Sequence, residues 1–249
     1  MTPLSVVIPA RNEEGSIEST VSAIEAVLLR EQIEHETIVV DDHSTDGTWA
    51  LLERLGRGFS SLRPIKNEGA GGFGRAVVAG IEASRGTYVA IMMADLSDDP
   101  EDLVRFYRAA LSTGADCVFG SRFIKGGAVY DYPPFKLILN RAANLTIRVL
   151  LAIRYNDATN AFKLYKRSTL EGLKPFLSPH FNLTVELPLK AIVRGYSYVV
   201  LPNSWRNRKH GASKFGIKEL GSRYLFILLY CLIERYFSRG DYRKKELPS

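Results

Sequence analysis

Acidic side chains follow two apolar segments of this sequence at the point where each segment ends. Residues 88–93 lead into Ala94-Asp95-Leu96-Ser97-Asp98-Asp99-Pro100, and residues 37–40 lead into Asp41-Asp42. An apolar run bounded by polar residues or proline predicts a buried strand of a parallel sheet. Because ligands of such sheets lie beyond the carboxyl ends of the strands, we expect both acidic groups at one edge. Carboxylates there suit a divalent cation with a diphosphate, or the ribose or base of a nucleotide.

Each acidic group also has a purely structural interpretation. Ser97 or Asp98 would cap a helix that begins at Pro100, and residues 44–47 would form a turn and a cap before another helix. Taken alone, each group is as compatible with a cap as with a site. Their joint position at two predicted strand ends favours a site.

The hydrophobic pattern predicts the elements that position these groups. Apolar runs predict strands at 4–8, 37–40, 62–65, 88–95, 115–119, 161–166 and 196–201. Helical periodicity or start signals predict helices at 17–28, 48–55, 75–84, 100–112, 140–153, near 168, 185–195 and 218–237. This alternation predicts an α/β fold in which a mostly parallel, Rossmann-like central sheet is flanked by helices. Residues 126–134 predict a loop over the site.

Composition limits the class of protein. The 249 residues are 46% hydrophobic and 24% charged, which is ordinary for a globular protein. Cys117 and Cys231 lie far apart, which predicts neither a disulfide framework nor a zinc site and fits a reducing compartment. The first residues lack the pattern of a signal peptide, so we expect a cytoplasmic location.

Charge divides the chain into an acidic and a basic half. Residues 1–120 hold 10 Lys and Arg against 19 Asp and Glu, whereas residues 121–249 hold 23 against 8. The net charges of −9 and +15 give the +6 of the whole chain and predict an anionic partner for the second half. Acidic lipid and a phosphorylated acceptor both fit. Nucleic acid is least supported, because no nucleic-acid-binding module pattern is present, so we expect no nucleic-acid partner.

A glycine-rich segment offers an alternative function. Gly69-x-Gly71-x-x-Gly74 matches the dinucleotide-binding fingerprint, and Asp95 lies 21 residues beyond Gly74. The fingerprint should follow the first strand of its unit, whereas this one follows two complete strand–helix units. A nicotinamide-dependent dehydrogenase is therefore a weak alternative, although a glycine-rich helix start would still offer N–H groups to an anion.

Several motifs together resemble family 2 glycosyltransferases of GT-A fold, in particular the dolichol-phosphate mannose synthase-like, or polyprenyl-phosphate glycosyltransferase, group. The resemblance spans about residues 4–216, with the motifs in order along the chain. The matching segments are Ser5-Val-Val-Ile-Pro9-Ala-Arg-Asn12-Glu13-Glu14, Ile38-Val-Val-Asp41-Asp42-His-Ser44-Thr-Asp46-Gly47-Thr48, residues 67–80, residues 94–100, Gly120-Ser121-Arg122-Phe123, residues 157–167 and Arg208-x-x-Gly211-x-Ser213-Lys214.

The resemblance implies a role for each matching position. Asp95 matches the last acid of the DxD motif, which holds Mg²⁺ or Mn²⁺ and the donor diphosphate, and Ser97 stands where relatives often have a metal-binding Gln. The implied metal-binding residues are Asp95, Ser97 and Asp98. The implied donor-nucleotide residues are Pro9, Ala10, Arg11, Glu13, Asp41, Asp42, Asn67 and Ala94. The basic residues implied around the acceptor phosphate and the diphosphate are Arg122, Arg141, Arg208 and Lys214. Together with Asp95, these residues form the implied catalytic set.

The implied reaction is inverting transfer of a sugar from a nucleotide-sugar, GDP-mannose or a UDP-hexose, to a polyprenyl or dolichyl phosphate. One position departs from the pattern, because Met93 stands where the first acid of DxD is expected. A thioether is a poor ligand for a hard cation. Two alternatives therefore stay open, namely transfer to a non-lipid acceptor and a non-catalytic relative that binds nucleotide or membrane.

The C-terminal segment predicts contact with a membrane surface. Residues 224–233 are apolar and are flanked by Arg223 and Arg235, but a bilayer span needs about twenty such residues. A helix in the membrane interface and a buried core helix are both compatible with this pattern. We therefore divide the chain into a catalytic domain, 1–216, and an amphipathic segment, 217–249. The expected location is peripheral at the cytoplasmic face of a membrane, with an integral-membrane subunit as an implied partner.

Overall fold

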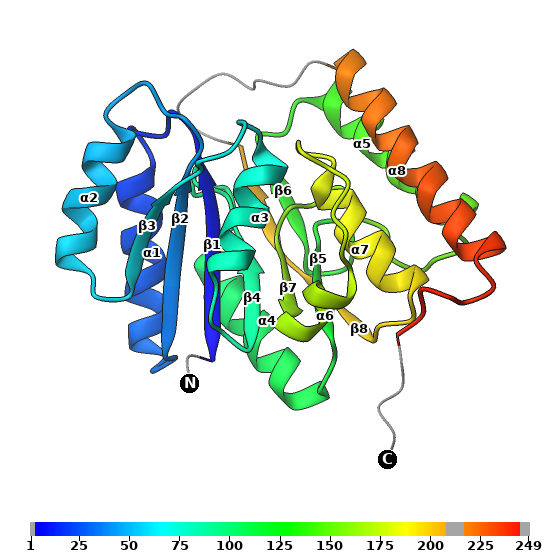
Figure 1. Ribbon diagram of the computed structural model, residues 1–249, viewed down its shortest axis with the longest axis horizontal. Coiled ribbons are helices and arrows are strands. Elements are labelled where there is room, and N and C mark those ends of the chain that lie inside the picture. Colours follow the sequence, from blue (N-terminus) through cyan, green and yellow to red (C-terminus); the bar gives the residue numbers. More distant parts are fainter. Residues whose placement is uncertain (1–2, 208–216, 245–249) are drawn as a thin grey trace.

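The computed structural model describes residues 3–207 and 217–244, and its helices cover both faces of a central sheet (Figure 1). The strands are β1 (Leu4–Ala10), β2 (His35–Asp41), β3 (Leu62–Lys66), β4 (Tyr88–Ile91), β5 (Cys117–Ser121), β6 (Ala128–Tyr130), β7 (Lys163–Lys166), β8 (Tyr198–Pro202) and β9 (Ser204–Arg206). The helices are α1 (Ile17–Arg30), α2 (Thr48–Gly58), α3 (Phe73–Ala83), α4 (Pro100–Thr113), α5 (Pro134–Leu150), α6 (Arg167–Gly172), α7 (Leu183–Val193) and α8 (Ile217–Phe237).

The main sheet has seven strands in the order β3-β2-β1-β4-β7-β5-β8. All neighbouring pairs are parallel except those of β7, which is antiparallel to both β4 and β5. The predicted α/β fold with a mostly parallel sheet is confirmed. Strand order reverses between β1 and β4, and such a switch point opens a crevice beyond the carboxyl ends of the two strands.

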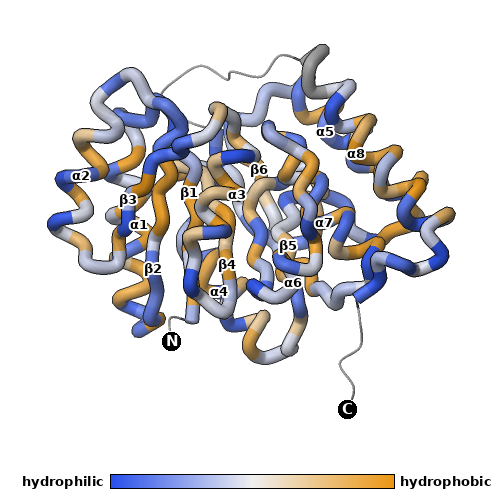
Figure 2. The backbone as a smooth tube through the Cα atoms, viewed as in Figure 1, coloured by the Kyte–Doolittle hydropathy of each residue, from blue (hydrophilic) through white to orange (hydrophobic). Residues whose placement is uncertain are grey.

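Apolar clusters on both faces of the sheet hold the layers together, the two largest lying on opposite faces. Alternate residues of β1 divide between them, since Leu4, Val6 and Ile8 face α1, α2 and α4, whereas Val7 faces α3. The second core continues through α6 and α7 to buried residues of α8. In Figure 2 orange stretches mark much of β2 and β4, because side chains buried on both faces of a sheet must be apolar.

Three element boundaries differ from the sequence prediction. The strand predicted at 88–95 ends at Ile91, because the chain then turns and Asp95 Oδ1 accepts a hydrogen bond from the Ser97 N–H at 3.2 Å. The predicted helix 140–153 begins six residues earlier, at Pro134, where proline fits the first turn of a helix. The predicted loop 126–134 contains β6, which pairs with β9.

The glycine-rich segment has a packing role that the sequence interpretation missed. A Cβ atom on Gly74 would lie 2.1 Å from the Ser178 carbonyl oxygen, so only glycine permits this approach. At the start of α3, the Arg75 N–H donates to the Pro179 carbonyl and the Gly72 N–H donates to Asp42 Oδ2. Two of the N–H groups at this helix start, those of Gly72 and Arg75, are therefore hydrogen-bonded within the protein.

Helix α8 is attached to the rest of the fold along one side. Ile227, Leu228 and Cys231 are buried in the core shared with α7. The Arg194 guanidinium donates to both carboxylate oxygens of Glu234, at 2.8 and 2.9 Å, and both side chains are buried. Within residues 3–207 and 217–244, no helix is long and apolar enough to cross a membrane.

We expect Gly74→Ala to lower the free energy of unfolding by about 1–3 kcal/mol or more, because the added methyl group meets backbone atoms that cannot rotate away. Gly58→Ala is the matched control, since a Cβ there has no heavy atom of the described chain within 4 Å. Alanine within a helix should leave stability unchanged or raise it by up to about 1 kcal/mol. Urea unfolding of both variants measures the difference. Equal stabilities would contradict the packing role of Gly74.

Candidate active site

The ends of several strands bring the predicted site residues to one edge of the sheet. Parallel strands β1, β2 and β4 end there at Ala10, Asp41 and Ile91, and β5 ends there at Ser121. Because β7 is antiparallel, its first residue, rather than its last, lies at this edge. The segment that precedes β7 therefore meets the segment that follows β5.

The carboxylates of Asp41 and Asp42 have different surroundings although both are buried. Asp42 Oδ1 accepts a hydrogen bond from the Asn67 amide at 2.8 Å, and Oδ2 accepts one from the Gly72 N–H at 2.8 Å. Asp41 Oδ1 is buried without a hydrogen-bond partner among the described residues. A buried acceptor left in this state marks a position that a ligand hydroxyl or amine would satisfy. Asp41 is thus the better candidate for ligand contact, and Asp42 holds the loop.

The remaining predicted donor residues surround the same strand ends. Pro9 and Ala10 are the last residues of β1, and the Ala10 carbonyl accepts from the Asp42 N–H at 2.8 Å. Glu13 lies in the turn before α1, where its N–H donates to Thr48 Oγ1 at 2.9 Å. Arg11 is exposed beside this turn. The Ala94 carbonyl is held from the other side by the Thr20 hydroxyl, at 2.9 Å.

The loop after β4 presents oxygen atoms of three residues. Asp95, Ser97 and Asp98 line one cavity, and the buried Ser97 Oγ has no hydrogen-bond partner among the described residues. The expected cap was assigned to the wrong residue, because Asp99 Oδ1 accepts from the Glu101 N–H at 3.0 Å and caps α4. Ser97 and Asp98 are therefore not used as helix caps.

Asp98 lies in an environment that disfavours its negative charge. Burial, followed by the nearby charge of Asp95, raises the pKa of Asp98 to about 7. Its Oδ2 accepts a hydrogen bond from the Met93 N–H at 3.3 Å. Within the described part of the chain, no three His, Cys, Asp or Glu side chains are grouped as a metal site. Two carboxylates and a hydroxyl nevertheless fit a hard cation that takes its remaining ligands from phosphates and water.

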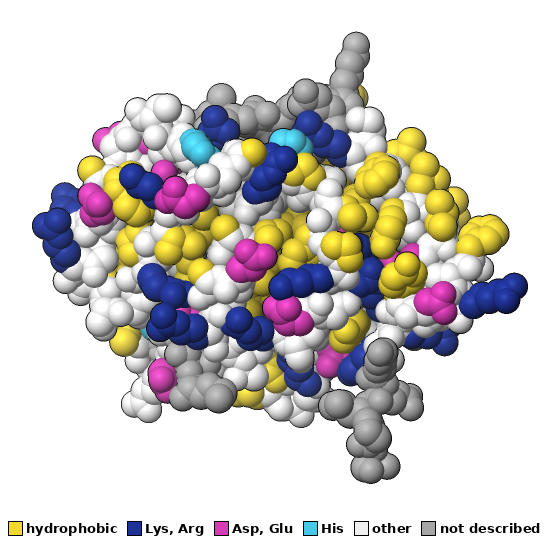
Figure 3. Space-filling model, viewed as in Figure 1, with side chains coloured by type: hydrophobic (Ala, Val, Ile, Leu, Met, Phe, Trp, Pro, Cys, Tyr) yellow, Lys and Arg dark blue, Asp and Glu magenta, His cyan; other side chains and the backbone are white. Residues whose placement is uncertain are grey.

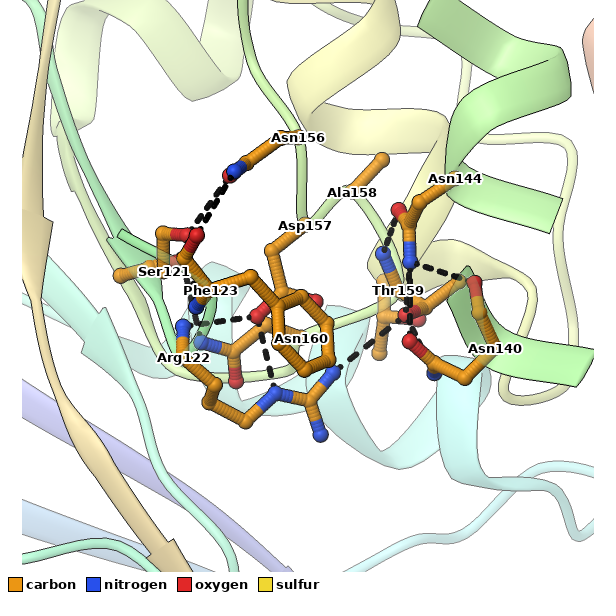
Figure 4. Close-up of polar contacts among 12 residues, drawn as sticks. Ser121, Arg122, Phe123, Asn140, Asn144, Asn156, Asp157, Ala158, Thr159 and Asn160 are labelled. Carbon is orange, nitrogen blue, oxygen red and sulfur yellow. Dashed lines mark hydrogen bonds and ion pairs between the residues drawn. The ribbon is translucent and has the colours of Figure 1, made fainter. Parts of the chain in front are cut away.

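Arg122, which also lines this cavity, forms a buried ion pair with Asp157 (Figure 4). Its Nε and Nη2 donate to the two carboxylate oxygens of Asp157, at 2.8 and 2.7 Å, and its backbone N–H donates to the same carboxylate at 2.9 Å. Burial opposes the charge of Arg122, but the Asp157 carboxylate outweighs it and raises the pKa of the guanidinium. Arg122 is a fixed positive charge with one edge of the guanidinium held by Asp157.

A chain of amides and hydroxyls joins this ion pair to α5 (Figure 4). Thr159 Oγ1 accepts from Arg122 Nη2 at 3.4 Å, from the Asn140 amide at 2.8 Å and from the Asn144 amide at 3.1 Å. The ammonium group of the buried Lys163 donates to three carbonyls, including those of Ala158 and Asn160. The segment 157–160 is therefore fixed from both sides.

A cavity of about 380 Å³ is lined by both charged and apolar residues. Its charged lining residues include Asp95, Asp98 and Arg122. Leu139 and Ala143 of α5 and Tyr224 of α8 contribute apolar surface. A larger hollow of about 1230 Å³ contains Asp116, Arg194, Glu234 and Lys244, but these charged groups pair with one another as Arg194–Glu234 and Lys244–Asp116. The smaller cavity is the candidate active site.

Not all predicted basic residues enter this cavity. Arg141 is exposed on α5, with its guanidinium 4.6 Å from the centre of the Phe123 ring, and it is not among the lining residues. Arg208 and Lys214 lie outside the described residues. Sequence analysis gave no role to Asp157 or Thr159, although the polar run Asp157-Ala-Thr-Asn160 before a strand was a usable signal.

The chain is similar in sequence and fold to known glycosyltransferases. Residues 5–173 match the family described as Glycosyl transferase family 2, and the chain belongs to this family. It is 33% identical over 215 residues to the polyprenol monophosphomannose synthase of Mycolicibacterium smegmatis, covering 84% of this chain and 79% of that protein. It is 31% identical to the dolichol-phosphate mannosyltransferase of Pyrococcus furiosus, covering 85% of this chain but only 58% of that longer protein.

Solved structures support the fold. The glucosyl-3-phosphoglycerate synthase of Mycobacterium tuberculosis in complex with UDP gives a TM-score of 0.67 at 22% identity, covering 94% of this chain and 80% of the other. The same synthase has been solved with Mn²⁺ and with Mg²⁺ in the presence of UDP. These structures confirm the predicted GT-A fold class, and the family match confirms the predicted membership of a glycosyltransferase family, whereas the residue assignments stay predictions.

We expect Arg122 and Asp157 to depend strongly on each other. Arg122→Ala or Asp157→Ala alone should cost about 3–5 kcal/mol of unfolding free energy, because each leaves an uncompensated buried charge. The double variant should lose less than the sum of the two single losses, by about 2 kcal/mol or more.

The exposed pair Arg54–Glu18, whose N–O distance is 3.0 Å, is the control and should show a coupling of about 0.5 kcal/mol or less. Urea unfolding measures all four corners of each cycle, with Asp157→Asn as a milder substitute if a single variant does not fold. Additive losses at Arg122 and Asp157 would contradict the role of the ion pair.

Proposed function

We propose that this enzyme transfers a hexosyl group from a nucleotide-sugar, GDP-mannose or a UDP-hexose, to a polyprenyl or dolichyl phosphate, with inversion at the anomeric carbon. The observation that supports this most directly is the composition of the cavity. Carboxylates and an arginine line the cavity together with apolar side chains of α5 and α8. A phosphate attached to a long hydrocarbon needs both kinds of surface.

Different residues would serve the donor and the acceptor of the proposed reaction. Asp41, with its buried Oδ1 lacking a partner in the described chain, is suited to a hydroxyl or amine of the donor nucleotide. Asp95, Ser97 and Asp98 would hold Mg²⁺ or Mn²⁺, and the bound cation would neutralise the leaving diphosphate. Arg122 would fix the acceptor phosphate near the anomeric carbon. A phosphate oxygen is already anionic near neutral pH, so its attack needs no dedicated base.

The relatives support a lipid phosphate as acceptor and a metal-dependent donor site. The two similar curated proteins have names that specify polyprenol and dolichol-phosphate mannosyl transfer. The fold relatives were solved with Mn²⁺ or Mg²⁺ and UDP. Such an acceptor implies work at a membrane surface, where α8 is the predicted contact. A cytoplasmic position at that surface and an integral-membrane partner subunit belong to the same proposal.

Two other functions are tested against this one. A phosphorylated acceptor without lipid is suggested by the synthase that was solved with phosphoglyceric acid. A non-catalytic nucleotide- or membrane-binding protein is suggested by Met93 at the first DxD position. A screen of nucleotide-sugars with Mg²⁺ or Mn²⁺, against both a polyprenyl phosphate and phosphoglyceric acid, separates the three. Release of nucleoside diphosphate only with the lipid phosphate supports our proposal, and turnover only with phosphoglyceric acid rejects it.

We expect Asp95→Asn to lower the rate of sugar transfer by at least about 100-fold, because it removes a charge aimed at the cation and diphosphate. Its thermal unfolding should stay close to that of the wild type, since Asp95 makes a local hydrogen bond that asparagine can also accept. Release of nucleoside diphosphate measures the rate.

Asp99→Asn is the matched control for Asp95→Asn. It lies four residues away and caps α4, and asparagine is an equally good cap, so activity and stability should both stay near wild type. A wild-type rate of sugar transfer in Asp95→Asn would contradict the assignment of Asp95 to the metal and diphosphate site. Similar losses in both variants would point to a general effect of charge in this loop.

Arg141→Ala should raise the acceptor KM about tenfold while leaving the donor KM nearly unchanged, because loss of one charge-assisted hydrogen bond costs about 1.5–3 kcal/mol. Arg148→Ala is the control, since Arg148 lies two turns further along the same helix and is also exposed. Initial rates with a short, water-soluble prenyl phosphate measure both constants. An unchanged acceptor KM in Arg141→Ala would remove Arg141 from the acceptor site.

A further inference from the structure

Two aromatic residues of the candidate active site have no part in the roles proposed for its charged residues. Tyr132 and Trp205 line the same cavity as Asp95 and Arg122, and both are half-buried. Their rings lie against each other, with 4.9 Å between the centroids and 58° between the planes. Figure 3 shows hydrophobic side chains gathered on the outside of the molecule along α8, whereas Tyr132 and Trp205 border a cavity. Aromatic residues in such a position form the walls of ligand pockets.

Backbone contacts fix Trp205 beside the loop that follows β4. Trp205 forms an antiparallel bridge with Asp98, and within β9 it pairs with Val129 of β6. The next residue, Arg206, donates its N–H to the Ser97 carbonyl at 3.0 Å. These contacts use backbone atoms, so they remain available when the Trp205 side chain is replaced.

A series of contacts leads from this loop to the buried arginine. The Asp98 backbone pairs with Trp205, and the Trp205 ring packs on the Tyr132 ring. The guanidinium carbon of Arg122 lies 6.0 Å from the centre of the Tyr132 ring. The aromatic pair therefore connects the proposed metal site to the residue proposed to hold the acceptor phosphate.

The proposed reaction requires the transferred hexosyl group to occupy the same interval. During inverting transfer, the bond from the anomeric carbon to a diphosphate oxygen breaks, and the diphosphate keeps the electron pair. A bond from the same carbon to an acceptor phosphate oxygen forms on the opposite face, so the carbon lies between the two phosphate groups. With the diphosphate at Asp95 and the acceptor phosphate at Arg122, the hexosyl ring would lie beside the aromatic pair.

A pyranose ring matches the chemistry of this position. Its faces carry C–H bonds that pack on aromatic rings, and its rim carries hydroxyl groups that need hydrogen bonds. The Trp205 indole offers an apolar surface and one N–H donor. The cavity is also lined by the amide side chains of Asn140 and Asn160. A hydrocarbon in this position would instead lie against charged groups at both ends of the pair, without polar atoms to satisfy them.

We propose that Trp205, held against Tyr132, is the wall that contacts the hexosyl group of the nucleotide-sugar and adds to the affinity for the sugar part of the donor. This assignment rests on the proposed function, which sets the positions of the diphosphate and the acceptor phosphate. The sequence motifs gave Trp205 no role, because its contacts with Asp98 and Tyr132 join segments that are far apart in the chain.

The experiment compares the binding of GDP-mannose and UDP-glucose with that of GDP and UDP, by titration calorimetry with Mg²⁺ and without acceptor. Trp205→Ala should weaken binding of the nucleotide-sugar that wild type prefers by about tenfold, but binding of the matching nucleoside diphosphate by about twofold at most, because only the sugar contact is lost. Trp205→Phe should retain more affinity for the nucleotide-sugar than Trp205→Ala, since it keeps an aromatic ring.

Tyr130→Ala is the matched control. Tyr130 is an aromatic residue of the same two-stranded sheet, it is 45% exposed, and it is not among the described residues that line the cavity. Its replacement should leave the affinity for the nucleotide-sugar near that of wild type. Equal losses of this affinity in Trp205→Ala and Tyr130→Ala would overturn the proposal. So would a loss in Trp205→Ala that is the same for the nucleotide-sugar and the nucleoside diphosphate.

Tryptophan fluorescence gives a second readout, because Trp49 and Trp205 are the two tryptophans of the chain. Trp49 lies in α2 with the Lys66 ammonium 4.5 Å from its ring centre, and Trp49→Phe leaves Trp205 as the reporter. Binding of the nucleotide-sugar should shift the emission of this variant to shorter wavelength, because the sugar displaces water from the indole. A shift of the same size with the nucleoside diphosphate would contradict the sugar contact.

Transfer assays separate this proposal from the proposed function. If wild type binds a nucleotide-sugar through Trp205 but transfers the sugar to phosphoglyceric acid alone or to neither acceptor, the proposed function fails and the sugar contact stands. If wild type transfers sugar to a polyprenyl phosphate and Trp205→Ala raises only the acceptor KM, the sugar contact fails and the proposed function stands. Absence of nucleotide-sugar binding by wild type overturns both.

Discussion

The buried ion pair between Arg122 and Asp157 fixes the geometry on which the candidate site depends. Two charges removed from water stabilise a fold only when each fully satisfies the other, and here the carboxylate accepts two side-chain bonds and one backbone bond. The pair joins the end of β5 to the segment before β7, which are 35 residues apart in the chain. Thr159 then connects the same segment to α5. The orientation of α5 beside the cavity therefore depends on a contact made at the sheet edge.

The antiparallel direction of β7 makes this contact possible, and it also limits what sequence could predict. Strand–helix alternation predicted the parallel part of the sheet, including the edge that holds Asp41 and Asp95, because that prediction needs only local periodicity. The pairing of β7 with β4 and β5 depends on contacts between segments far apart in the chain, which local periodicity does not determine. Asp157 was visible as a polar residue before a strand, but its partner followed only from the direction of that strand.

The glycine-rich segment also shows a limit of prediction from sequence. The segment 69–74 matched a phosphate-binding pattern, and the structure assigns Gly74 to close contact with the Ser178 carbonyl instead. Both uses need a residue without a side chain, so the sequence alone cannot distinguish them. Helix α8 is a similar case, since Ile227 and Cys231 face the core while Phe226 and Ile233 face outward. One side of α8 is therefore buried as the core-helix interpretation expected, whereas its contact with a membrane interface stays a prediction.

Met93 departs from the family pattern, because it stands where the first acid of DxD is expected. The loop that follows it nevertheless places another carboxylate, that of Asp98, beside this position. Asp98 returns to the start of its own loop, and its carboxylate accepts the Met93 N–H, so an acidic group lies beside the position that lacks one. The antiparallel bridge between Asp98 and Trp205 and the bond from the Arg206 N–H to the Ser97 carbonyl hold the loop there. Holding Asp98 buried next to Asp95 disfavours its charge, as its raised pKa shows. A buried carboxylate beside a second, partly exposed carboxylate is the arrangement that the cation of the proposed metal site would stabilise.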